Sequence, residues 1–122
     1  MNYSTLKNHP LNNFSPDDKI NYLKILSYLC FIDNDFCLSE RQVLDSYCMH
    51  FDIPERIKQE TIREIQNYKF EDIRKIISNL IEKNGIDIKA TLIRDLEILS
   101  AVDQKITIEE YNFLSNLIET KF

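Results

Sequence analysis

The sequence predicts an all-α fold, a compact bundle of about six helices. It contains one glycine and three prolines among 122 residues, whereas proteins built from strands and tight turns need many more turn-forming residues. Its apolar residues recur at helical spacing, most clearly from Phe70 to Ile81. With 43% hydrophobic and 29% charged residues, the composition is typical of a globular domain.

Residues 1–14 are expected to be less well ordered than the rest of the chain. Residues 1–14 are polar and lack periodicity, so we expect a loosely ordered N-terminal segment that includes His9. Residues 15–122 have the length of a single domain. No secretory signal is recognised, and no apolar run is long enough to span a bilayer. Three cysteines without a CxxC pair favour a reduced, cytoplasmic protein in which Cys30 and Cys48 are buried.

The first predicted helix spans residues 16–32. Ser15 is a suitable N-cap and Pro16 suits the first helical position. The two aspartates that follow are favoured there by the helix dipole. The helix is apolar on almost all sides, so it should lie centrally. A second helix is predicted from Ser39 to His50. Its expected inward side chains are Val43, Leu44, Tyr47, Cys48 and Phe51.

Proline and glycine mark the limits of the third and fourth helices. The third begins near Pro54, with Asp52 or Ile53 at its cap. It ends near Asn67. The fourth ends at Asn84-Gly85, where Gly85 is expected to adopt the left-handed conformation. The expected inward side chains are Ile57, Thr61, Ile65 and Tyr68 in the third helix, and Phe70, Ile73, Ile76, Ile77, Leu80 and Ile81 in the fourth.

The fifth predicted helix covers residues 88–102 and is again apolar on most sides, so it should be the second central helix. The sixth follows a capping box, in which Thr107 is the N-cap and Glu110 stands at N3. Its expected inward side chains are Tyr111, Leu114, Leu117 and Ile118.

One motif occurs twice in the chain, at an offset of 70 residues. Each copy has an aspartate, an apolar residue three positions later and a glutamate seven positions later. The copies are Asp33, Phe36 and Glu40, and Asp103, Ile106 and Glu110. Flanking apolar residues match at the same offset: Leu26 with Leu96, Leu29 with Leu99, Ile32 with Val102, and Leu44 with Leu114. This repetition predicts two pseudo-repeated helix–loop–helix units with acidic residues in both connecting loops.

Two interpretations of these loops remain open. An aspartate at a helix end is disfavoured by the helix dipole, but it can form an Asx-type turn while the glutamate closes the next helix cap. Alternatively, the two loops meet and form one acidic site. Its residues would be Asp33, Asp35, Glu40, Asp103 and Glu110. Such oxygen-rich sets bind Ca²⁺ or Mg²⁺, or form a docking face for a basic protein. An EF-hand is excluded, because the loops are too short and lack its glycine.

Charge and side-chain chemistry argue against several functions. A net charge of −5, with lysine and arginine interleaved among acidic residues, disfavours nucleic-acid binding. No glycine-rich phosphate loop or HExxH zinc motif is present. Cys48 and His50 stand two positions apart, so they face different sides of a helix and make a poor catalytic pair. We therefore expect no catalytic residues. A hydrolase that uses carboxylates alone stays an alternative, which requires them to line a concave pocket.

The repeated motif resembles the hallmark of the TerB-like family of tellurite-resistance proteins, an Asp-Gly-x-Ile-Ser/Thr-x-x-Glu segment that follows an apolar helix. The matching residues are Asp103, Ile106, Thr107 and Glu110 and, more loosely, Asp33, Phe36 and Glu40. Asn34 and Gln104 stand where the family has glycine, and Cys37 replaces its serine or threonine. The stretch from Met49 to Glu55 is similar to the family's step into the third helix, so the resemblance covers residues 18–121.

The resemblance implies an all-helical TerB-like domain whose acidic residues bind metal and which serves in bacterial stress response or phage defence. We therefore expect a non-enzymatic module for protein interaction or metal response. A basic protein is the expected partner, and Ca²⁺ or Mg²⁺ the expected cation. The alternative function is that of a small acidic immunity protein, which neutralises a basic toxin such as a nuclease by presenting acidic groups.

Overall fold

The computed structural model describes residues 9–32, 38–101 and 107–120. Within these ranges the chain forms six α-helices and one short 3-10 helix, and no strand. The predicted all-α class is therefore confirmed. The elements in chain order are η1 (Pro10–Asn13), α2 (Pro16–Phe31), α3 (Leu38–His50), α4 (Glu55–Ile65), α5 (Phe70–Asn84), α6 (Asp87–Ala101) and α7 (Ile108–Glu119).

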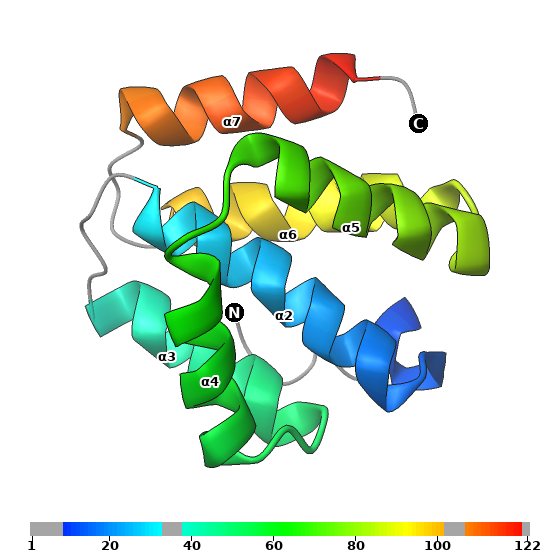
Figure 1. The fold of residues 1–122 in the computed structure, drawn as a ribbon, viewed down its shortest axis with the longest axis vertical. Helices are drawn as coiled ribbons and strands as arrows, with labels where there is room; N and C mark the ends of the chain where they lie inside the picture. Colours follow the sequence, from blue (N-terminus) through cyan, green and yellow to red (C-terminus); the bar gives the residue numbers. More distant parts are fainter. Residues whose placement is uncertain (1–8, 33–37, 102–106, 121–122) are drawn as a thin grey trace.

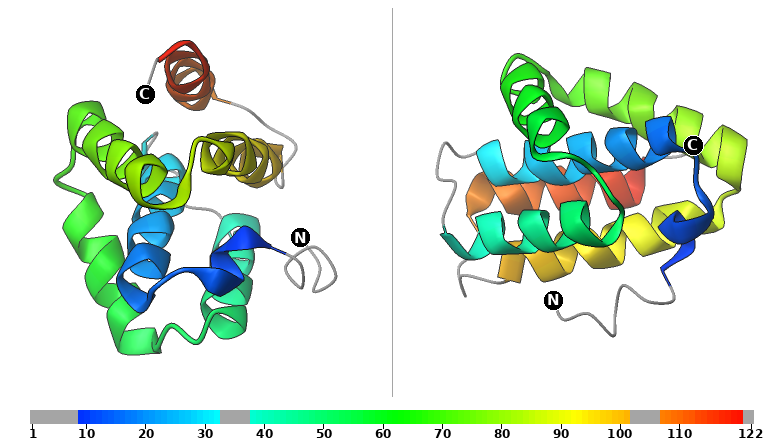
Figure 2. Two further views of the ribbon diagram at one scale, coloured as in Figure 1. Left: turned by 90° about the vertical axis from the view of Figure 1, so that its right-hand side faces the viewer. Right: turned by 90° about the horizontal axis from the view of Figure 1, so that it is seen from below.

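Two helices form the centre of the bundle, as their all-round apolar sequences predict. Helix α2 packs against α3, α4, α5 and α6, and α6 packs against α2, α3, α5 and α7 (Figure 1). Figure 2 shows α7 as an outer layer that lies over α5 and α6. The core side chains of α2, among them Tyr22, Ile25, Leu26 and Leu29, are fully buried. No helix in the described part of the chain combines the length and apolarity needed to cross a membrane.

Helix starts largely follow the predicted capping chemistry. The Ser15 hydroxyl accepts a hydrogen bond from the Asp18 N–H at 3.2 Å, with Pro16 at the first helical position. Helix α4 differs slightly, because Pro54 is itself the N-cap and the helix begins one residue later. The chain turns at Asp52, two residues before this N-cap, where φ is positive at 58°. At the end of α5, Gly85 has φ 95° and ψ 160°. Its φ is positive as predicted, but its ψ is extended rather than left-handed helical.

The predicted loose order of the N-terminus does not hold for residues 9–14. His9 and Leu11 are buried, and Pro10 begins the short helix η1. Leu11 belongs to the hydrophobic core, and Phe14 packs against that core. The physical reason is that the apolar side chains of Leu11 and Phe14 pack into or against the core, and the paired imidazole of His9 is buried beside them. Residues 1–8 lie outside the described part.

The predicted inward face of α7 is partly wrong. Leu114 and Leu117 are buried as expected, but Tyr111 and Ile118 are exposed. Phe113 is buried instead, with its ring 5.3 Å from Tyr28 and 5.6 Å from Phe70 between centroids. This large aromatic side chain sets the rotation of the helix, and the two other apolar residues consequently face outward. The predicted inward residues of α3, by contrast, are all buried.

Candidate functional site

The structure describes two of the five residues of the predicted acidic site. Asp33, Asp35 and Asp103 lie outside the described residues, so their approach to one another stays a prediction. Glu40 and Glu110 stand in the first turns of α3 and α7, and each is only 3% exposed. Their carboxylates therefore lie beneath the surface and are not available to an approaching protein.

Glu110 is held by the N-cap of its helix. The Glu110 N–H donates to the Thr107 Oγ1 at 3.1 Å, which confirms Thr107 as the N-cap. The Thr107 hydroxyl in turn donates to the Glu110 Oε1 at 3.1 Å. The Glu110 carboxylate of the predicted capping box thus accepts a hydrogen bond from the side chain of the N-cap residue, Thr107. This contact holds the Glu110 side chain in place inside the bundle.

The residues that flank the two loops lie at one end of the molecule. Helices α2 and α6 end there, and α3 and α7 begin there (Figures 1 and 2). The first residues of α3 and α7, Leu38 and Ile108, are 70% and 72% exposed. They occupy equivalent positions at the offset of the repeated motif. This end of the bundle therefore presents two exposed apolar side chains, each two residues before a buried glutamate.

A metal site is not formed by the described residues alone. Among residues 9–32, 38–101 and 107–120, no group of three or more histidine, cysteine, aspartate or glutamate side chains could hold an ion. A cation at the predicted site would need the loop aspartates as ligands, because Ca²⁺ and Mg²⁺ take six or more oxygen ligands, some of them from water.

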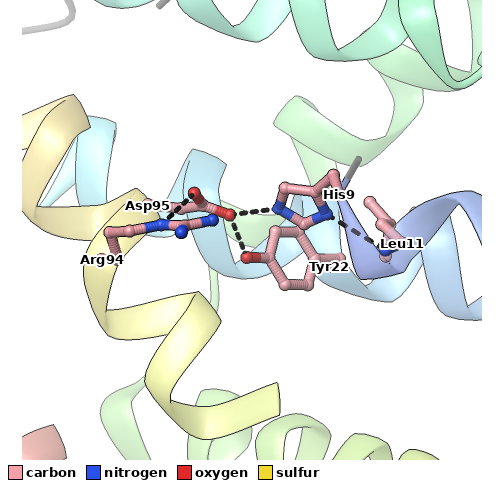
Figure 3. A network of polar contacts seen from close by, with 5 residues as sticks. All are labelled: His9, Leu11, Tyr22, Arg94 and Asp95. Carbon is pink, nitrogen blue, oxygen red and sulfur yellow. Dashed lines mark hydrogen bonds and ion pairs between the residues drawn. The ribbon is translucent and has the colours of Figure 1, made fainter. Parts of the chain in front are cut away.

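A buried polar network, which the sequence did not predict, joins three elements (Figure 3). Asp95 of α6 lies at its centre. Its Oδ2 is 2.6 Å from the His9 Nε2 and also accepts a hydrogen bond from the Tyr22 hydroxyl. The Leu11 N–H donates to the His9 Nδ1 at 3.0 Å. Arg94 approaches from the surface, with its Nε 4.0 Å from the Asp95 Oδ1.

The backbone contact of His9 defines its tautomer. Because the Nδ1 accepts a hydrogen bond from the Leu11 N–H, the ring proton lies on the Nε2. The Nε2–H then donates to the Asp95 carboxylate. Burial, followed by the charge of Asp95, raises the pKa of Tyr22 and of Tyr47. Both phenols therefore stay protonated.

This network links the N-terminal residues to α2 and α6. His9 and Asp95 are buried, and both ring nitrogens of His9 are already bonded. A general base needs an accessible nitrogen within reach of a substrate proton. The nearest signal in the sequence is Asp95 itself, a carboxylate among the apolar residues Leu92, Ile93 and Leu96. Such a residue requires a buried partner, but nothing in the sequence identifies His9 as that partner.

A second polar cluster surrounds Lys58, a buried residue of α4 whose side chain reaches Asp45 of α3. Its Nζ is 2.9 Å from the Glu55 Oε2 and also bonds the Asp45 carboxylate. Burial disfavours the lysine charge, but the hydrogen bonds to both carboxylates outweigh it and raise the pKa of Lys58. Lys58 therefore remains cationic and does not act as a nucleophile.

The Lys58 cluster borders a cavity of about 450 Å³. Phe31, Leu44 and Ile62 supply its apolar lining, and Asp45 and Glu55 are its acidic side chains. Both carboxylates are already paired with Lys58, so they are poorly placed for hydrolytic chemistry. Glu40 and Glu110 do not line this cavity. The carboxylate hydrolase considered from the sequence therefore gains no support from it.

Cys48 is expected to resist thiol reagents in the folded protein. Burial raises the pKa of its thiol to about 12, so at pH 8 only about one molecule in ten thousand carries the reactive thiolate. Iodoacetamide labelling followed by peptide mass spectrometry should find Cys48 unmodified in native protein and modified in guanidinium. Rapid labelling of native protein would contradict the burial of this side chain.

Comparisons with known proteins yield no match: no family model, no curated protein and no solved structure matches the chain. The TerB-like resemblance thus stays a prediction that depends on the repeated motif.

Proposed function

We propose that the chain is a non-enzymatic, TerB-like interaction module of bacterial stress response or defence. Its binding end is the one where α2 and α6 end and α3 and α7 begin. The observation that carries this proposal is the matched exposure of Leu38 and Ile108, each two positions before a buried glutamate. We take this pair as the apolar part of a binding surface, because exposed apolar patches mark protein-interaction sites.

The pseudo-repeat gains support from equal burial at equivalent positions. Leu26 and the equivalent Leu96 are both buried, and so are Leu29 and the equivalent Leu99. Glu40 and Glu110 share the same exposure. Two related units would place their acidic loops at one end, and the sequence there carries Asp33, Asp35 and Asp103. Together with the net charge of −5, these acids favour a basic partner.

In its metal-responsive version, the module binds one divalent cation through the five predicted residues. Millimolar Ca²⁺ or Mg²⁺ should then raise the melting temperature by several degrees, because a ligand at 100 times its Kd adds about 2.7 kcal/mol of stability. Asp33→Asn combined with Asp103→Asn should remove this rise, and Glu60→Gln with Glu82→Gln, which changes two exposed acids elsewhere, should not. An unchanged melting temperature in the unaltered protein rejects the metal version.

The protein-interaction version is tested separately. The protein is used as bait to capture partners from an extract of the source cells. The variant with Leu38→Ser and Ile108→Ser should no longer capture them. Met49→Ser is the control and should still do so, because Met49 is an apolar side chain on α3 of similar exposure. Capture should also weaken as salt concentration rises, because charge attraction is screened. Partners that bind the Leu38 and Ile108 variant as well as the unaltered protein would reject this end as the binding surface.

An immunity protein is the second candidate, and the acidity of α7 favours it. That helix contains three glutamates and neither lysine nor arginine. This function requires tight, salt-sensitive binding to one basic toxin, and addition of the chain should abolish the toxin's activity. A captured partner that is basic and toxic would favour this candidate over the stress-response module.

A further inference from the structure

Helix α7 has an unusual outer face. Ile108, Tyr111 and Ile118 are 72%, 62% and 53% exposed. Their spacing places them along one side of the helix, with Ser115 between them at the helical repeat. We call these three residues the α7 outer face. The opposite side is buried through Phe113, Leu114 and Leu117, so the helix is apolar on both its inner and its outer side.

The position of α7 leaves this face open to a partner. The helix forms the outermost layer of the bundle, and among the described elements none lies beyond it (Figure 2). A single exposed apolar side chain is ordinary on a protein surface. Three on one side of a 12-residue helix, with Ser115 between Tyr111 and Ile118, form an apolar stripe, and exposed apolar patches mark interaction sites.

The charge around the stripe selects the kind of partner. Residues 107–120 contain three glutamates and no lysine or arginine, and Glu109 and Glu119 are exposed. Lys89 of α6 does reach α7, but its Nζ donates to backbone carbonyls at the helix end, 2.7 Å from the Thr120 oxygen and 3.4 Å from the Ile118 oxygen. Among the described residues of α7 and its two caps, the charged side chains beside the α7 outer face are therefore all acidic.

We propose that the α7 outer face binds a basic amphipathic helix of a partner protein. The apolar side of that helix covers Ile108, Tyr111 and Ile118, and its lysines or arginines pair with Glu109 and Glu119. A second copy of this chain is a poor occupant, because two α7 helices would bring like charges together. An anionic membrane is disfavoured for the same reason, since helices that lie on such membranes are rich in basic residues. This inference rests on the proposed function in taking the chain to be a binding module, and it extends the proposed binding end, with which it shares Ile108, along the outer side of α7.

The test uses the full chain and a fluorescein-labelled amphipathic peptide of leucine and lysine, about 14 residues long to match α7. Fluorescence anisotropy at low salt should show binding that Tyr111→Ser with Ile118→Ser weakens by about tenfold or more. Ile108 is left unchanged in this variant, because it also belongs to the proposed binding end. Met49→Ser with Ile86→Ser is the matched control, because these apolar side chains are 68% and 57% exposed elsewhere. It should change the affinity by less than about twofold.

Further variants in the same binding measurement have outcomes that support or reject the proposal. Glu109→Gln with Glu119→Gln should weaken binding and flatten its salt dependence. Equal binding by the Tyr111 and Ile118 variant and the unaltered protein rejects the α7 outer face, and so does equal loss in the Met49 and Ile86 control. If Leu38→Ser with Ile108→Ser abolishes binding while the Tyr111 and Ile118 variant does not, the proposed function survives and this inference fails. A dimer in sedimentation that Tyr111→Ser dissociates would instead assign the face to a second copy.

Discussion

Replacing His9 with alanine should lower the free energy of unfolding by about 2–4 kcal/mol. The substitution removes the hydrogen bond that the Nε2 donates to the buried Asp95 carboxylate, and it leaves the Leu11 N–H without its acceptor. It also removes a ring that lies 5.6 Å from the Tyr22 ring between centroids. Urea unfolding followed by circular dichroism measures the loss.

The second histidine of the chain is the matched control. His50 is only half-buried, and its Nε2 is 3.0 Å from the Asn12 Oδ1, so His50→Ala should lower stability by less than about 1 kcal/mol. A double-mutant cycle of His9→Ala with Asp95→Asn should give a coupling energy above about 1 kcal/mol. Equal losses for the two histidines would contradict the buried network.

Replacing Phe113 with alanine should lower the free energy of unfolding by about 3–5 kcal/mol. Phe113 is the buried aromatic side chain of α7 and contacts the rings of Tyr28 and Phe70. Its removal leaves a cavity beneath α7, whose other buried apolar side chains are Leu114 and Leu117. Amide hydrogen exchange should therefore accelerate in α7 more than in α2, because the outer helix opens before the centre of the bundle does.

Tyr111 supplies the control for this prediction. It belongs to the same helix and is also aromatic, but its side chain is exposed, so Tyr111→Ala should change stability by less than about 0.5 kcal/mol. If Tyr111→Ala proves as damaging as Phe113→Ala, the rotation assigned to α7 is wrong.

Local rules in the sequence predicted most of the fold. The sequence identifies Ser15 and Thr107 as caps from residue type alone, because their hydroxyl oxygens can accept a hydrogen bond from an N–H group of the first helical turn. The inward residues of α3 and α5 followed from helical spacing. The two central helices followed from their lack of a polar side. These features depend on neighbours within one or two turns.

The features that the sequence did not predict depend on distant contacts. The rotation of α7 is determined by Phe113 packing against Tyr28 and Phe70, and helical spacing alone favoured Tyr111 and Ile118 equally well. The burial of His9 depends on Asp95, which lies 86 positions further along the chain. Of the candidate site, burial of Glu40 and Glu110 is established, whereas the geometry of the loop aspartates stays a prediction.

The His9–Asp95 contact has a consequence for the order of folding. It joins residues separated by 86 positions, so it forms only after at least the first 95 of the 122 residues have been synthesised. Until α6 is in place, the His9 imidazole lacks its carboxylate partner, although its neighbours Tyr22, Tyr47 and Phe51 come earlier in the chain. Closing so long a loop carries an entropic penalty that helix formation does not. The imidazole of His9, among the first described side chains to be synthesised, therefore gains its buried partner late.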